Sequence, residues 1–138
     1  MKKKIDWQIE FDNFIEKNRF KGFKWGSWDC VTFAVACVKA MTGEDLKPKE
    51  LKWKNKTEAQ KTIKEYGKTL NKSLAKACKK KGLINVDINY LQKGDLIVYK
   101  EESELVGMYD GFNFLTPTDD KLGVKKDVNV LSAWRINA

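Results

Sequence analysis

Apolar residues in the first third of the chain recur at helical spacing. Residues 6–18 alternate apolar and polar positions with a period near 3.6, which predicts an amphipathic first helix. Residues 30–41 are apolar at nearly every position, and this pattern predicts a second helix that is buried on most sides. Asp29 is a suitable N-cap for that helix and Gly43 a suitable C-terminal stop. We therefore expect residues 30–41 to lie at the centre of the fold.

The middle of the chain predicts two short helices with lysines on their polar faces. The first covers residues 57–66, where Thr57 and Gln60 have the spacing of a capping box. The second covers residues 71–81 and ends at Gly82. Each has one apolar stripe, so each is expected to pack one face against the rest of the molecule.

The pattern changes after residue 82 to short apolar runs separated by turn residues. Such runs predict strands joined by tight turns. The expected strands are residues 95–99, 105–109, 112–115, 122–124 and 130–136. Helices followed by an antiparallel meander indicate an α+β fold, with the central helix packed on the sheet. The length of 138 residues favours one domain spanning 1–138.

Composition restricts the classes of function. The first residues are basic but are followed by an amphipathic segment, so we expect no signal peptide, and no run is long enough to span a membrane. The three cysteines are irregularly spaced, which favours a reducing compartment over a disulfide framework. Because the chain contains no histidine and no CxxC motif, we expect neither a metal site nor a cofactor.

Positive charge is concentrated in the middle of the chain. The net charge is +8, and residues 47–93 carry 14 basic and 4 acidic side chains. Such a segment is a solvated lysine face or a surface for an anionic partner. Arginine, whose planar fork reads bases and phosphates, occurs only at Arg19 and Arg135. Sequence-specific binding of nucleic acid is therefore not expected.

The candidate chemistry lies where an aromatic, glycine-containing loop meets the central helix. Cys30 would occupy the first turn, where free N–H groups and the helix dipole favour a thiolate and can bind an oxyanion. Asp29 caps the helix and is a candidate for orienting a pocket. Trp25 and Trp28 flank Gly26, and we expect them either to line a groove beside Cys30 or to cover the core.

Four segments carry a resemblance to a known family. Residues 23–30 (FKWGSWDC) resemble the nucleophile segment of papain-like cell-wall peptidases of the NlpC type, and residues 93–99 (KGDLIVY) resemble the first strand of their sheet. Residues 105–109 resemble the next strand, which carries the catalytic histidine in active members. With residues 133–136 (AWRI), the order is most similar to a family of such domains in phages and prophages. The resemblance implies a papain-like fold.

The chain departs from that family at the catalytic base. Leu105 occupies the position that matches the histidine, and the third polar member would fall near Leu115 or Thr116. Tyr109 and Asp110 lie in the same stretch and complete the candidate pocket, although strand end and turn is the simpler interpretation. Thiol hydrolysis needs a base to form the thiolate and an acid to protonate the leaving group. Cys30 is thus the nucleophile equivalent without a partner.

Three functions remain open from the sequence. The first is a non-catalytic papain-like module of a phage or prophage, associated with the virion or its tail, that binds a virion protein, a host protein or a peptidoglycan fragment. The second is a residual thiol hydrolase that acts on peptidoglycan through Cys30. The third, weaker function is a nucleic-acid-binding accessory protein using the basic middle. In the first case the resemblance implies the host cytoplasm during production and the virion afterwards.

Overall fold

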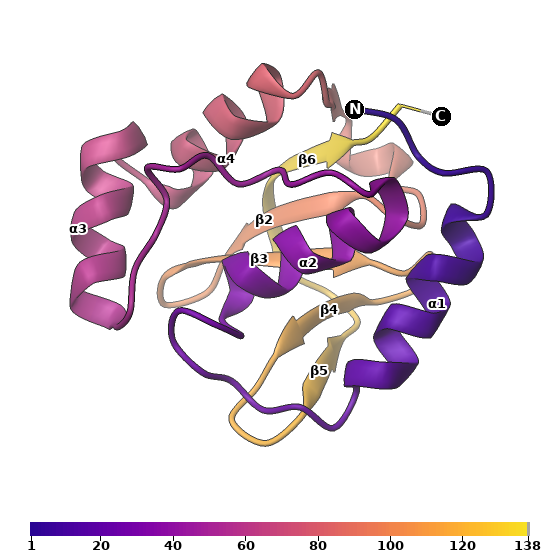
Figure 1. Ribbon diagram of the computed structural model, residues 1–138, viewed down its shortest axis with the longest axis horizontal. Coiled ribbons are helices and arrows are strands. Elements are labelled where there is room, and N and C mark those ends of the chain that lie inside the picture. Colours follow the sequence, from indigo (N-terminus) through magenta and orange to yellow (C-terminus); the bar gives the residue numbers. More distant parts are fainter. Residues whose placement is uncertain (138) are drawn as a thin grey trace.

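Helices come first along the chain and strands follow, as the hydrophobic pattern predicts. The computed structural model describes residues 1–137 and has an α+β fold in which every strand pair is antiparallel (Figure 1). The helices are α1 (Trp7–Asn18), α2 (Cys30–Thr42), α3 (Lys56–Gly67), α4 (Leu70–Lys80) and the 3-10 helix η1 (Ile88–Tyr90). The strands are β1 (Ile84–Val86), β2 (Leu96–Lys100), β3 (Glu104–Tyr109), β4 (Phe114–Pro117), β5 (Leu122–Lys125) and β6 (Asn129–Arg135).

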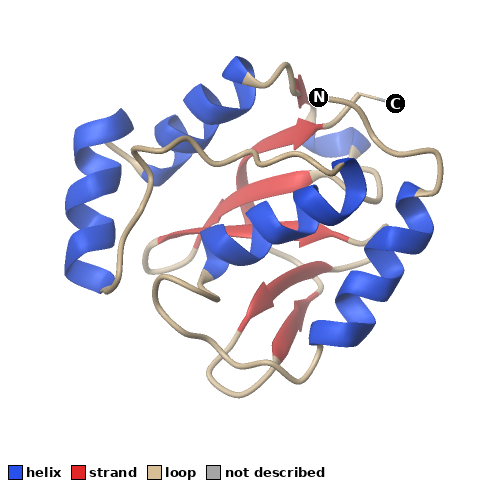
Figure 2. Ribbon diagram, viewed as in Figure 1, coloured by secondary structure: helices blue, strands red, loops and turns tan. Residues whose placement is uncertain are grey.

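The six strands form one sheet in the order β1-β6-β2-β3-β4-β5 (Figure 2). Strands β2 to β5 are the expected meander, but the expectation that the whole sheet is a meander is wrong. Strand β6 returns to pair with β2, and β1 pairs with β6. The sequence pattern missed β1 because its three residues carry no clear alternation, and two of them stay exposed at the sheet edge.

The central helix α2 packs across one face of the sheet, against β3 and β4 (Figure 1). Its start and stop are those predicted: the Asp29 carboxylate accepts a hydrogen bond from the Thr32 N–H in a capping box, and Gly43 ends the helix at φ 80°. Phe33, Ala34, Cys37, Val38 and Met41 are fully buried, and together with Leu96, Val98, Val106, Met108 and Leu115 from the sheet they form the main core. The start of α2 is thereby held rigidly beside β3.

Helices α3 and α4 form a pair at one side of the molecule, where α3 packs against α4 (Figure 1). Helix α3 begins one residue earlier than predicted, and the expected Thr57 cap is wrong. Asn55 is the N-cap, because its side chain accepts from the Glu58 N–H at 2.9 Å. Apart from Ala59, the side chains of α3 are partly or fully exposed.

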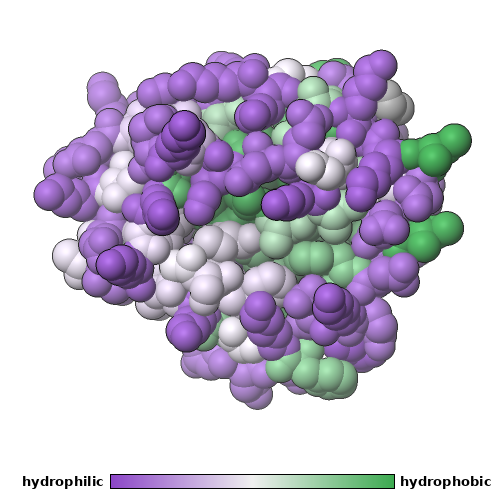
Figure 3. Space-filling view, in the orientation of Figure 1, coloured by the Kyte–Doolittle hydropathy of each residue, from purple (hydrophilic) through white to green (hydrophobic). Residues whose placement is uncertain are grey.

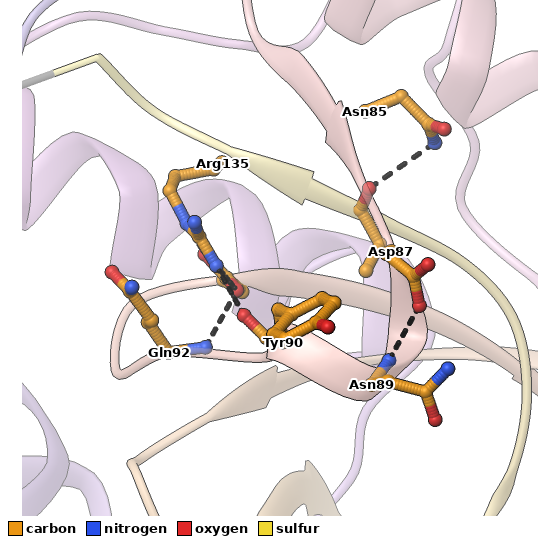
Figure 4. A network of polar contacts seen from close by, with 8 residues as sticks. Asn85, Asp87, Asn89, Tyr90, Gln92 and Arg135 are labelled. Carbon is orange, nitrogen blue, oxygen red and sulfur yellow. Dashed lines mark hydrogen bonds and ion pairs between the residues drawn. The ribbon is translucent and has the colours of Figure 1, made fainter.

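A buried ion pair fastens the turn before β2 to the last strand. Asp95 is fully buried, and its carboxylate accepts two hydrogen bonds from Arg135, from Nε at 2.9 Å and from Nη2 at 2.8 Å. The same carboxylate accepts from the Gln92 N–H at 2.8 Å. Figure 4 shows the Arg135 side chain beside Gln92 and Tyr90, and Nη2 also donates to the Tyr90 carbonyl at 2.8 Å. This network holds residues 90–95 against β6.

Candidate functional site

A cleft of about 580 Å³ opens beside Cys30. Its walls come from α3, the aromatic loop, the first turn of α2 and the β2–β3 turn. We call it the Cys30 cleft, and it is lined by Phe23, Trp25, Asp29, Cys30, Val31, Trp53, Lys56, Ala59, Gln60, Ile63, Lys64, Lys68, Thr69, Leu70, Ser103, Glu104 and Leu105. On the face of the molecule shown in Figure 3, a band of pale and green residues runs between purple hydrophilic residues.

Asp29 organises the wall of the cleft as well as capping α2. It is 1% exposed, and its second carboxylate oxygen accepts from the Gly26 N–H at 2.9 Å and from the Trp53 indole Nε1 at 2.8 Å. Gly26 has φ 83°, and a Cβ there would lie 2.6 Å from the Trp53 carbonyl oxygen. Glycine is therefore required where the aromatic loop meets the Trp53 segment. One buried carboxylate thus joins the loop, α2 and Trp53.

Cys30 is a half-buried free cysteine that lines the cleft. Burial raises the pKa of the Cys30 thiol to about 12, and the nearby Asp29 carboxylate raises it further. The backbone N–H groups of Val106 and Val31 act in the opposite direction but do not outweigh burial. The pKa of Cys30 is therefore shifted in the direction opposite to the one expected from its place at the helix start, because burial outweighs the effect of the N–H groups there.

Leu105 lines the same cleft as Cys30. The position where the resemblance requires an imidazole base is thus occupied by an aliphatic side chain, which packs against the cluster of Ile97 and Tyr99. The two positions considered for a third polar member are also occupied structurally: Leu115 belongs to the core, and the buried Thr116 hydroxyl donates to the Val106 carbonyl at 3.0 Å. Among the described residues that line the cleft, every basic side chain is a lysine.

Only part of the predicted pocket comes together. Trp25, Asp29, Cys30 and Leu105 line the cleft, and Gly26 is bonded to its wall. Three other residues, Trp28, Tyr109 and Asp110, lie outside that lining. Their assignment to the pocket was therefore wrong.

Packing and strand geometry explain these three errors. Trp28 is 4% exposed and packs edge to face on Phe33 in the core, with ring centroids 5.6 Å apart. Tyr109 ends β3 and packs on Phe114, whereas Leu105 stands near the other end of the strand. Four residues of strand separate them by roughly 13 Å. Asp110 accepts from the N–H groups of Phe112 and Asn113, which is the turn interpretation.

The sequence pattern missed the wall that comes from the basic middle. The lining includes Trp53, Ile63 and two lysines of α3, Lys56 and Lys64, although they are distant from Cys30 along the chain. The one available signal was Trp53 itself, because a lone tryptophan in a lysine-rich segment needs an apolar partner and a partner for its indole N–H.

Within residues 1–137, no group of three or more His, Cys, Asp or Glu residues is arranged to hold a metal ion. In the same range no helix is long and apolar enough to cross a membrane.

Fold and site together define a class: an α+β domain with a helix-start cysteine in an apolar, lysine-rimmed cleft. The chain belongs to the family described as a domain of unknown function, DUF6950, whose model matches residues 2–136. No match was found among curated proteins.

Proposed function

We propose that this protein is a non-catalytic papain-like module of a phage or prophage, associated with the virion or its tail. In this proposal the Cys30 cleft binds a protein or cell-wall partner and does not cleave it. The order of the Asp29-Cys30 segment, the buried helix and the antiparallel strands supports the papain-like assignment. The phage setting rests on the resemblance of the four sequence segments.

One observation supports the proposal that the protein does not catalyse thiol hydrolysis: Cys30 and Leu105 line the same cleft. Burial raises the pKa of the Cys30 thiol to about 12, so the attacking thiolate is scarce at neutral pH. An aliphatic side chain at position 105 neither accepts the thiol proton nor returns one to a leaving group. The aromatic and aliphatic walls, by contrast, are suited to bind a ligand.

Binding through the cleft should not depend on the sulfur. We expect Cys30→Ala to bind peptides on a random peptide array, or to co-sediment with peptidoglycan sacculi, within about twofold of the wild type. Trp25→Ala, which removes a 38%-exposed aromatic wall, should weaken the same interaction at least about tenfold. Circular dichroism spectra of both variants serve as the control for folding.

The competing hypothesis is a residual hydrolase, and the same variants distinguish it. If the wild type released amino groups from sacculi and Cys30→Ala did not, the residual thiol hydrolase would replace our proposal. If binding were unchanged in Trp25→Ala, the partner would bind elsewhere and the assignment of the cleft would be wrong.

A further inference from the structure

The rim of the Cys30 cleft carries a row of lysines on one side of α3. Lys56, Gln60 and Lys64 are spaced four residues apart, and Lys68 follows after the same interval at the end of the helix. Residues at this spacing lie on one side of a helix. The row is about 18 Å long at 1.5 Å per residue, which is the length of an extended peptide of about five or six residues.

These lysines have no carboxylate partner in the described part of the chain. Its ion pairs involve Arg19, Lys93, Lys125 and Arg135 instead. Within α3 the two lysines of the row, Lys56 and Lys64, are eight residues apart with the uncharged Gln60 between them. Ion pairs within the described chain therefore do not explain the row.

The carboxylates that line the cleft are already engaged. The Asp29 carboxylate accepts from Gly26, Thr32 and Trp53, and a Glu104 oxygen accepts from the Asn71 N–H at 2.9 Å. These two side chains are thus fixed by donors of the wall. The lysines of the row are therefore available to pair with negative charges of a ligand.

Lys68 is held at the rim by a strained backbone. It has φ 73° and ψ −51°, and the Thr69 N–H donates to the Gly67 carbonyl across it at 2.9 Å. This is a γ-turn with positive φ, a conformation that is rare and costly for a residue with a side chain. Lys68 is the one non-glycine residue with positive φ in the described chain. Glycine would adopt this backbone conformation at a lower conformational free energy than lysine. The presence of lysine therefore indicates that its positive charge is functional.

From this geometry we infer that the Cys30 cleft binds an extended segment of a partner protein in which an apolar side chain is flanked by Asp or Glu. The apolar anchor packs between Trp25, Ile63 and Leu105, and the acidic residues pair with the lysine row. This inference rests on the proposed function, since it names the partner of the same cleft. A protein segment fits this cleft better than a glycan, because several negative charges beside one apolar group are needed to match the lysine row and the apolar wall.

The test uses three pools of synthetic peptides with a fixed central leucine and flanking positions that are acidic, amide or lysine. We expect the acidic pool to bind about tenfold more tightly than the amide pool at low salt. The difference should fall below about twofold at 0.5 M salt, because screening weakens exposed pairs. The double variant Lys64→Gln/Lys68→Gln should lose the preference but still bind the amide pool.

Two matched variants separate a specific rim from general charge. Lys72→Gln/Lys79→Gln removes two exposed lysines of α4 that do not line the cleft, and it should keep the acidic preference. Lys68→Gly removes one rim charge and relieves the backbone strain, so it should be more stable than the wild type and yet show a weaker preference.

The outcomes distinguish the two proposals. If all pools bind equally and Trp25→Ala abolishes binding, the cleft functions in binding but the acidic segment is wrong. If no pool binds, this inference fails, and co-sedimentation with sacculi alone decides the proposed function. If the α4 control loses the preference equally, or a single-stranded oligonucleotide displaces the acidic pool, the surface is a general polyanion site and the inference is overturned.

Discussion

Replacing Leu105 by histidine should make the Cys30 thiol more reactive. The imidazole would enter the cleft that Cys30 already lines, and an opposite charge beside a thiol lowers its pKa by about 1–3 units. Nucleophilicity falls as the pKa falls, with a Brønsted slope of about 0.4–0.5. We therefore expect the rate of Cys30 alkylation by iodoacetamide at pH 7 to rise about 3- to 50-fold. Peptide mapping by mass spectrometry locates the modified cysteine.

The matched control is Leu105→Gln, which is polar and of similar size but does not titrate. It should leave the alkylation rate close to that of the wild type. If Leu105→Gln accelerated the reaction as much as Leu105→His, greater solvent access rather than charge would be the cause. If neither variant changed the rate, the side chain at position 105 would not affect the pKa of the Cys30 thiol, and the match of this position to the catalytic base would be wrong.

Removing the Arg135 side chain should destabilise the fold strongly. Arg135→Ala leaves the fully buried Asp95 carboxylate with only the Gln92 N–H as a donor. Deleting one partner of a buried ion pair costs about 3–5 kcal/mol. Since the Arg135 side chain is 23% exposed, we expect the lower end of this range, about 3 kcal/mol, in the free energy of unfolding measured with urea.

The exposed pair between Arg19 and Glu16 provides the comparison. Both side chains are more than half exposed, and exposed pairs contribute about 0–1 kcal/mol. Arg19→Ala should therefore change the free energy of unfolding by less than about 1 kcal/mol. Equal losses in the two variants would mean that the buried network is not what fastens residues 90–95 to β6.

Local signals allowed the central element to be predicted. Asp29, the apolar run of α2 and Gly43 each act within a few residues, so cap, helix and stop can be read directly from the sequence. The order of β2 to β5 follows equally from short runs and turns. The place of β6 does not, because its pairing with β2 and β1 depends on contacts between residues about 30 to 50 positions apart along the chain.

The site was less predictable because its properties arise from distant packing. The helix start favours a thiolate at Cys30, but strand β3 covers the sulfur, and burial dominates its pKa. Trp25 and Trp28 belong to the same aromatic loop, yet Trp28 is in the core and Trp25 lines the cleft. No local pattern brings Trp53 to Asp29, since that bond spans 24 residues.

The central claim, that the cleft is retained while thiolate chemistry is lost, is tested most directly by the pH dependence of Cys30 alkylation in the wild type. With the pKa raised to about 12, only about one thiol in ten thousand is ionised at pH 8. The rate at Cys30 should then rise about tenfold for each pH unit from 7 to 10, without a plateau. A plateau at or below about pH 8.5, the ordinary thiol pKa, would contradict the account and favour a working thiol enzyme.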